Sequence, residues 1–337
     1  AHLSFTPGSA GNRRTWTFSA WMKRCNFGTR QTIFSAASGP AYLQIGPDAA
    51  STEAITILNE GSGTDLNWYT DAVYRDPGSW FHVVWQFDST QSDADNRTKL
   101  WVNGSRITDF TKGATPDQNL EGAINNNVEH KIGEASHAAT FYLDAYLAEI
   151  HFIDGTAKEA SDFGETNSST GEWVPINYSG SYGTNGFYLK GQDSSALGDD
   201  SSGNGNDFSS SGLAAADQMS DSPTDNHCVL NALDGAGTLS DGNLVNAATG
   251  SSFVSRRATI GIPSSGKWAF RVKKSANNFM VGVMAPRATD GDPDSNGIDA
   301  VYYYDNDGTS SGDIQTRRSG SKVVETTDSP AGIATDT

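Results

Sequence analysis

The segment at residues 80–88, with the sequence WFHVVWQFD, constrains the fold of this chain more than any other feature. Aromatic and β-branched residues dominate it, and such residues favour the half-buried surface of a β-sheet. A second segment follows at residues 101–104, where Trp-Val runs into Asn103-Gly104. Asn-Gly is the preferred pair for closing a tight β-hairpin. Together the two segments predict a protein of packed β-sheets. His82 alternates with Phe81 and Val83, and we expect it to be packed or hydrogen-bonded rather than catalytic.

The composition supports this fold class and excludes several function classes. The 36 Gly, 8 Trp, 11 Tyr and 15 Phe suit an all-β protein with many short strands and Gly-rich turns. The net charge of −17 argues against a nucleic-acid partner, which requires basic patches. The sequence contains no apolar run long enough to predict membrane insertion. Cys25 and Cys228 lie far apart, so we expect no disulfide framework.

The 337 residues are sufficient for two domains. We predict a first domain over residues 1–190, a Gly/Ser/Asp/Asn-rich linker over 191–226, and a second domain over 227–337. In the first domain we expect a strand pair within 141–153 and a short helix at 156–163 that ends at Gly164. The remaining strands of that domain are expected at 15–23, 31–35, 42–45, 54–58, 80–87 and 99–102.

The second domain shows further strand-like segments and no helical periodicity. Strands are expected at 258–262, 267–273, 279–284 and 300–304. Few strand-like segments follow Tyr304, so we expect an incomplete β-sandwich.

No catalytic residues are predicted. Glycosidases built on β-sheets can carry their paired acids on one face of a strand. The nearest candidates here, Asp144 and Glu149, are five residues apart and would lie on opposite faces of a regular strand. The histidines show no spacing suited to a zinc site.

Two segments are candidate calcium loops, because closely spaced carboxylates and amides on a Gly-rich loop suit this ion. One contains Asp200, Asn204 and Asn206, and the other contains Asp292, Asp294 and Asn296. The same residues are preferred turn formers, so an ordinary turn is the alternative for both segments. Calcium is the one cofactor that the sequence suggests.

Two pairs of aromatic residues are candidate sugar-binding sites, because a ring face can stack on a pyranose. The first pair is Trp68 and Tyr69, and the second is Tyr178 and Tyr182 in a polar loop. Packing in the core is the alternative for both pairs.

The order of several motifs resembles a known family. Trp16-Thr-Phe-Ser-Ala-Trp, Trp80-Phe-His-Val-Val, Leu100-Trp-Val-Asn-Gly and the aromatic segment at 141–150 occur in the order of the laminin-G-like, concanavalin A-like jelly roll. Residues 266–272 and 281–283 resemble the core of a SPRY domain. The resemblance implies an all-β fold, with a concanavalin A-like jelly-roll sandwich followed by an incomplete SPRY-like β-sandwich.

Other motifs are similar to virion-associated proteins of tailed phages, especially marine ones. They lie at residues 74–82, 146–155, 163–166, 200–207 and 221–226. This resemblance implies a non-enzymatic virion protein, such as a tail fibre, a capsid fibre or a decoration protein. Its expected partners are other virion proteins and a host surface glycan, and a homo-oligomer, for example a trimer, is expected. The alternatives are a secreted glycoside hydrolase with a lectin-like module and a purely structural virion protein without a ligand.

Overall fold

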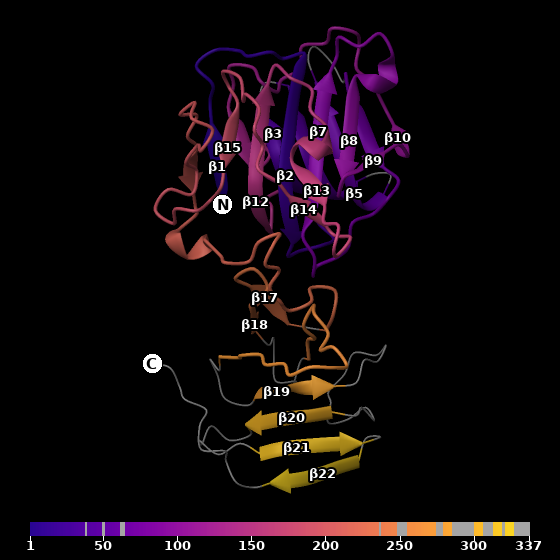
Figure 1. Cartoon of the computed structure of the whole chain (residues 1–337), viewed down its shortest axis with the longest axis vertical. Helices are drawn as coiled ribbons and strands as arrows, with labels where there is room; N and C mark the ends of the chain where they lie inside the picture. The colour runs from indigo at the N-terminus through magenta and orange to yellow at the C-terminus, as the bar shows by residue number, and fades with distance from the viewer. Residues whose placement is uncertain are drawn as a thin grey trace. The chain divides into compact units, whose positions relative to one another are not determined.

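Strands form nearly all the regular structure of the chain, as the aromatic and β-branched segments predict (Figure 1). The computed structural model describes residues 1–37, 39–48, 51–60, 65–235, 237–247, 255–273, 279–284, 300–305, 313–318 and 321–326. The chain divides into unit 1, Ala1–Cys228, and unit 2, Val229–Thr337. The helices in the described residues are 3-10 turns at Ala94–Asn96, Ala160–Asp162 and Ala215–Asp217, so the all-β prediction is confirmed.

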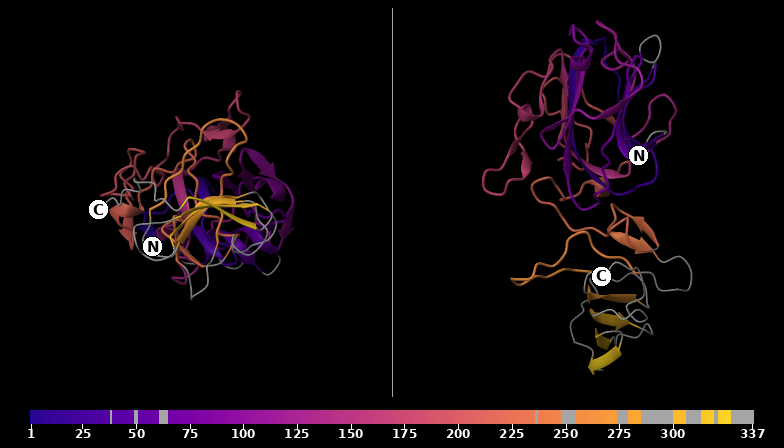
Figure 2. Two further views of the ribbon diagram at one scale, coloured as in Figure 1. Left: turned by 90° about the horizontal axis from the view of Figure 1, so that it is seen from below. Right: turned by 90° about the vertical axis from the view of Figure 1, so that its right-hand side faces the viewer.

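Unit 1 is a sandwich of two antiparallel sheets, which appear as two layers in the right-hand view of Figure 2. The eight-stranded sheet has the order β10 (Phe110–Lys112), β6 (Asn67–Thr70), β5 (Ser51–Asn59), β4 (Ala41–Asp48), β3 (Gln31–Ala36), β11 (His130–Ile132), β1 (His2–Phe5), β16 (Ser209–Ser211). The six-stranded sheet has the order β15 (Phe187–Leu189), β12 (Ala145–Asp154), β2 (Thr15–Arg24), β7 (Phe81–Asp88), β8 (Thr98–Val102), β9 (Ser105–Ile107).

Aromatic side chains fill the space between the two sheets. Phe18 of β2 stacks on Phe34 of β3 with the ring centroids 4.5 Å apart, and Trp16 meets Trp85 edge-to-face at 4.7 Å. Strand alternation places Trp16, Phe18, Ala20 and Met22 of β2 in this core. Trp21 lies on the opposite face of the same strand, where it is also buried. The outer face of the six-stranded sheet is therefore covered as well.

The hairpin between β8 and β9 has the predicted turn. Asn103 has φ +47° and Gly104 has φ +77°, and Asn-Gly tolerates this left-handed conformation at both positions. The predicted strand pair at 141–153 is instead one strand, β12, with a bulge between Ala148 and His151. The helix expected at 156–163 is reduced to the 3-10 turn Ala160–Asp162, because this segment is too short to stabilise helical turns by itself.

Residues 191–226, which the sequence predicts as a linker, are part of unit 1. Strand β16 pairs with β1, and Phe208 is buried in the main core. Most of this segment is attached to unit 1 by hydrogen bonds rather than by apolar side chains. Its sequence is therefore poor in apolar residues and looks like that of a linker.

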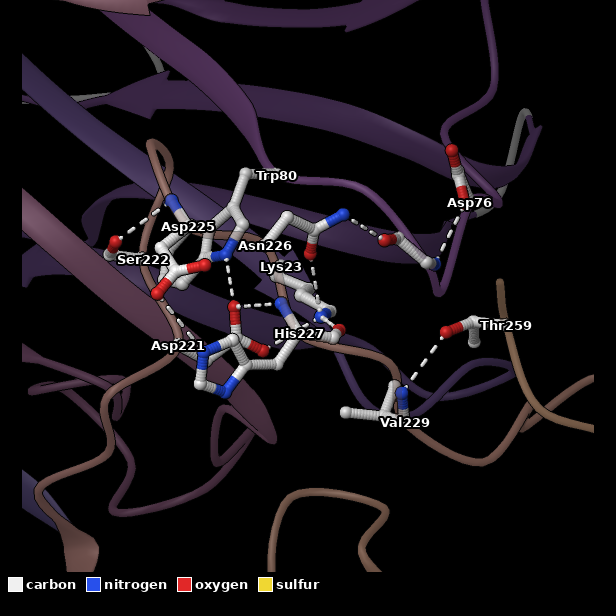
Figure 3. A network of polar contacts seen from close by, with 11 residues as sticks. Lys23, Asp76, Trp80, Asp221, Ser222, Asp225, Asn226, His227, Val229 and Thr259 are labelled. Atoms are coloured by element: carbon white, nitrogen blue, oxygen red, sulfur yellow. Dashed lines mark hydrogen bonds and ion pairs between the residues drawn. The ribbon is translucent and has the colours of Figure 1, made fainter. Parts of the chain in front are cut away.

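The strongest attachment surrounds Lys23, whose ammonium group is fully buried (Figure 3). It donates to Asp221 Oδ2 at 2.7 Å, to Asn226 Oδ1 at 2.8 Å and to the carbonyl of His227 at 2.6 Å. The indole of Trp80 donates to the other Asp221 oxygen at 2.7 Å. A buried ion pair is tolerated when each partner is satisfied in this way. We call these residues, Lys23, Trp80, Asp221, Asn226 and His227, the Lys23 clasp.

Unit 2 contains a hairpin of β17 (Thr238–Ser240) and β18 (Val245–Ala247). It also contains one antiparallel sheet of β19 (Phe279–Met284), β20 (Ala300–Asp305), β21 (Asp313–Arg318) and β22 (Ser321–Thr326), in sequence order. The strands predicted at 279–284 and 300–304 are present, and β21 and β22 were not predicted. Residues 267–273 form no strand, and 258–262 contribute one isolated bridge at Ala258. Nowhere in the described part of the chain does a helix reach the length and apolarity needed to span a bilayer.

Candidate functional site

The outer face of the six-stranded sheet is covered by residues 155–186, which include the hairpin of β13 (Gly164–Thr166) and β14 (Trp173–Pro175) (Figure 1). A small apolar cluster holds this segment in place. It consists of Val84, Trp101, Ile153, Ala160 and Phe163. Trp173, Tyr178 and Tyr182 pack against the cluster and are half-buried, so the covering segment brings aromatic rings to the surface.

His82 lies beneath this segment and is a packed residue, as the strand pattern predicts. It is 1% exposed and stacks on Trp21 at 4.9 Å. Its Nε2 donates to Ser19 Oγ at 2.7 Å, while Nδ1 accepts from the indole of Trp173 at 3.1 Å. Burial, with a smaller contribution from the nearby His151, lowers the pKa of His82 to about 3. Ser19 is fully buried, so the Ser19–His82 pair has no access to substrate.

The bulge in β12 directs a carboxylate toward the aromatic segment. Glu149 has φ +50°, an uncommon conformation for a residue other than Gly. Its carboxylate accepts a hydrogen bond from the hydroxyl of Tyr188, and the Nε2 of His151 lies 3.8 Å away. Bulges often reorient a side chain beside a functional site. The bulge reverses the alternation along β12, because Leu147 packs against the main core before it and Ile150 after it, so Glu149 lies on the outer face with His151.

Three tyrosines surround His151. The His151 ring stacks on Tyr188 at 4.1 Å, and its Nδ1 accepts a hydrogen bond from the Tyr182 hydroxyl at 3.0 Å. Tyr178 meets Tyr182 edge-to-face at 5.1 Å, and its hydroxyl donates to the carbonyl of Ser181. Each tyrosine hydroxyl is thus used internally, which fixes the orientation of its ring. We call Glu149, His151, Tyr178, Tyr182 and Tyr188 the tyrosine cluster.

Charged side chains surround the tyrosine cluster. Lys158 Nζ lies 5.6 Å from the ring centroid of Tyr178, and Lys190 Nζ lies 5.1 Å from that of Tyr188. Lys158 also pairs with Asp162 at 3.2 Å. The cluster therefore combines half-buried rings with a carboxylate, an imidazole and two nearby ammonium groups, a mixture of apolar and polar groups that small-ligand sites use.

The protonation states of the cluster follow from its burial and its hydrogen bonds. Burial by itself would raise the pKa of Glu149, but hydrogen bonds with His151 and Tyr188 outweigh it, and the pKa is lowered. Burial lowers the pKa of His151, and burial raises the pKa values of Tyr178, Tyr182 and Tyr188. At neutral pH the cluster thus presents a carboxylate, a neutral imidazole and neutral phenols.

The structure brings the predicted pair Tyr178 and Tyr182 together in this cluster. Sequence reasoning missed Tyr188, His151 and Glu149. The signal for Tyr188 was its place between Phe187 and Leu189, since alternation puts it outside when its neighbours are in the core. Nothing in the sequence marked the bulge that brings Glu149 to the same face.

In the other predicted aromatic pair, Trp68 and Tyr69, the structure contradicts the prediction for Trp68. Trp68 is 2% exposed and belongs to the main core, where it packs against Phe110 at 5.2 Å. The prediction for Trp68 is wrong because strand alternation on β6 turns its ring inward. Tyr69, on the opposite face, is half-buried.

In the loop predicted to bind calcium, the side chains hold the backbone. The Asp200 carboxylate accepts hydrogen bonds from the amides of Tyr188, Ser202 and Asn206 and from the Ser202 hydroxyl. The side-chain amides of Asn204 and Asn206 each donate to the carbonyl of Gly186. The donors already saturate Asp200, so this loop has the character of the turn alternative. Asp292, Asp294 and Asn296 lie outside the described residues, and among those described no group of three or more His, Cys, Asp or Glu side chains is arranged for a metal.

Comparison with known proteins identifies the fold of unit 1. Residues 1–162 match the family model described as the concanavalin A-like lectin/glucanases superfamily. None of the curated proteins matches the chain. The jelly-roll sandwich expected from the sequence resemblance is thereby confirmed, whereas the SPRY-like resemblance of residues 227–337 stays a prediction.

Several solved structures are similar to parts of the chain. A Bacteroides ovatus protein proposed to bind carbohydrate has 16% identity and a TM-score of 0.44, covering 62% of this chain and 55% of its own. Tailspike protein 2 of bacteriophage CBA120 has 16% identity and a TM-score of 0.35, covering 48% and 25%. Domain 4 of an extracellular arabinanase from Geobacillus stearothermophilus, solved with arabinotriose, has 15% identity and a TM-score of 0.31, covering 44% and 64%. The chain thus spans about half the length of the first of these proteins.

Proposed function

Residues 1–162 carry a concanavalin A-like lectin/glucanase domain, and on that premise we propose that unit 1 binds a saccharide without hydrolysing it. The observation that carries the proposal is the tyrosine cluster. Its three rings are held in place by the hydrogen bonds of their own hydroxyls. Glu149 lies at the Tyr188 hydroxyl, and Lys158 and Lys190 lie over the rings of Tyr178 and Tyr188. Rings fixed in advance lose little conformational entropy when a sugar stacks on them.

Binding is preferred over hydrolysis because the candidate pair of carboxyl groups is too widely spaced. Glycosidases need two carboxyl groups roughly 5–9.5 Å apart, and one of them must be a general acid with a raised pKa. Burial raises the pKa of Asp144, but Asp144 lies just before β12 and Glu149 lies five positions later, which corresponds to about 16 Å of extended chain. The lowered pKa of Glu149 suits a carboxylate that accepts hydrogen bonds from sugar hydroxyls.

The test is binding of the full chain to an array of immobilised glycans, followed by titration of the strongest binder against single-site variants. Tyr178→Ala removes a ring and should weaken binding roughly 2- to 12-fold, the range for one aromatic contact. Tyr69→Ala, at a half-buried tyrosine on the other sheet, is the matched control and should leave binding unchanged. If wild-type protein binds no glycan on the array, the proposal is wrong.

The hydrolase alternative is tested with the same ligands. A reducing-sugar assay on the bound polysaccharide should show no release of ends by the wild-type chain. Release that disappears in Glu149→Gln or Asp144→Asn would replace the binding proposal with an enzymatic one.

We further propose that this binding module belongs to a virion adhesion protein that meets a host glycan and neighbouring virion subunits. The motifs at residues 74–82, 200–207 and 221–226, which resemble phage virion proteins, support the setting. In unit 1 two of these motifs have structural roles, since Asp200 holds a loop and Asp221 holds Lys23. Mass spectrometry of purified particles, together with light scattering of the isolated chain for its oligomeric state, tests the setting.

A further inference from the structure

A second pair of aromatic rings lies on the loop between β11 and β12, away from the residues of the tyrosine cluster. Phe141 is 36% exposed and Tyr142 is 53% exposed. All other aromatic side chains described in unit 1 are buried or half-buried. These two adjacent rings are therefore the most exposed among the Phe, Tyr and Trp residues described in unit 1.

The backbone of this loop is strained and tightly hydrogen-bonded. Ala139 has φ +46° and Phe141 has φ +54°, a left-handed conformation that is unfavourable for a residue other than Gly. The carbonyl of Phe141 accepts from the amide of Thr32 at 2.8 Å, and the amide of Leu143 donates to Gly133 at 2.9 Å. These hydrogen bonds hold the loop in its strained conformation. The strained residues include Phe141, one of the two exposed rings.

The two rings are also fixed individually. The Tyr142 hydroxyl donates to the carbonyl of Ala139 at 2.9 Å, which closes the side chain back on its own loop. The guanidinium of Arg30 lies 5.2 Å from the ring centroid of Phe141. Among the described residues, no aromatic ring or cation contacts the ring of Tyr142. We call Arg30, Phe141 and Tyr142 the loop platform.

We propose that the loop platform is a second saccharide site, which stacks the C–H face of a pyranose on the exposed ring of Tyr142, next to the Phe141 ring that Arg30 packs against. A tyrosine ring supplies the apolar face that such stacking needs. Two rings present a few hundred Å² at most, whereas a stable protein partner needs about 800 Å² on each side. A single sugar unit of a polysaccharide fits the exposed area. The ligand class rests on the proposed function, but the residues are different.

The experiment is affinity gel electrophoresis of the full chain in gels that contain dextran, galactomannan or alginate, two neutral polymers and one of uronic acids. Tyr142→Ala should raise the dissociation constant roughly 2- to 12-fold on the polymer that retards the wild type. Tyr142→Phe keeps the ring and should remain near the wild-type value. Each variant is also combined with Tyr178→Ala, which weakens the tyrosine cluster, so that binding at the loop platform is measured separately. Equal urea midpoints confirm that the exposed substitutions leave the fold intact.

Hydroxyl-radical footprinting gives a second, direct readout. The retarding polymer should protect Tyr142 from oxidation, and this protection should persist in Tyr178→Ala. If Tyr142 is unprotected and Tyr142→Ala binds as the wild type does, while Tyr178→Ala weakens binding, the loop platform is refuted and the tyrosine cluster stands. If no polymer retards the wild type and none protects Tyr142, both sites are refuted.

Discussion

The indole nitrogen of Trp173 donates a hydrogen bond to Nδ1 of His82 at 3.1 Å, joining β14 of the covering hairpin to a central strand of the six-stranded sheet. The bond fixes the imidazole as the neutral form that carries its proton on Nε2, and Ser19 accepts from that position. Trp173 therefore links the covering hairpin to the sheet by a side-chain hydrogen bond, in addition to the apolar cluster that holds the covering segment. That segment carries Tyr178 and Tyr182, so the His82–Trp173 bond supports the tyrosine cluster indirectly.

The position of Trp173 also explains why residue 104 is a glycine. A Cβ at Gly104 would come within 2.5 Å of the Trp173 ring, and Gly104 has φ +77°. Gly104→Ala should therefore suffer both backbone strain of about 1 kcal/mol and overpacking of about 1–3 kcal/mol. Gly171→Ala is the matched control, since Gly171 has the same φ of +77° with nothing within 4 Å of a Cβ. Urea unfolding should show a larger loss for Gly104→Ala. Equal losses would mean that the ring does not restrict this position.

The Asn103-Gly104 turn and the strand around His82 were predictable because turn chemistry and alternation are local. The covering of the outer face was not predictable, since Trp173 reaches His82 across 91 positions of sequence. Likewise Tyr178 and Tyr182 could be proposed from their polar loop. The bulge at Glu149 could not, because a positive φ at a Glu leaves no sequence signal.

Acid pH should destabilise unit 1 through its buried histidines. Burial lowers the pKa of His82 to about 3 and that of His130 to about 4, against about 6.5 in an unfolded chain. The unfolded state therefore binds more protons between these values. The stabilisation is complete above pH 6.5 and is lost as the pH falls toward 3–4. Each histidine adds a slope of up to about 1.4 kcal/mol per pH unit.

The measurement is the free energy of urea unfolding at pH 6 and pH 5, where most carboxylates remain ionised. His82→Gln keeps a donor and an acceptor but cannot titrate. The slope of its unfolding free energy against pH should therefore be smaller than that of the wild type by up to about 1.4 kcal/mol per pH unit, the value for one proton. Identical slopes for the two proteins would show that His82 is not buried in the neutral form.

The Lys23 clasp should set the boundary of the folding unit. A chain ending at residue 162, where the family match ends, lacks β15 and β16 and loses Phe187, Leu189 and Phe208 from the core. It should fail to fold cooperatively, whereas a chain ending at 228 should unfold in one transition. Within the full chain, Lys23→Met leaves Asp221 buried without its cation and should cost about 3–5 kcal/mol.

Two further results test the clasp itself. Lys23→Met combined with Asp221→Leu removes both charges and should recover much of the loss. Limited proteolysis should cut residues 218–228 faster in Lys23→Met than in the wild type. A fragment of residues 1–162 with the urea midpoint of the full chain would contradict the boundary.

Substitution of Glu149 should change saccharide binding while leaving the free energy of unfolding nearly unchanged. Its φ of +50° costs about 1 kcal/mol or more, and the hydrogen bond from Tyr188 returns about 0.5–1.5 kcal/mol. Glu149→Gly relieves the strain and loses the bond, so the free energy of unfolding should change by less than about 1 kcal/mol. Saccharide binding should weaken, because Tyr188 loses the partner that orients it. Glu149→Gln is the control that keeps an acceptor for Tyr188 but retains the strain, and it should bind more tightly than Glu149→Gly while being no more stable. A Glu149→Gly protein that binds as well as the wild type would remove this carboxylate from the site.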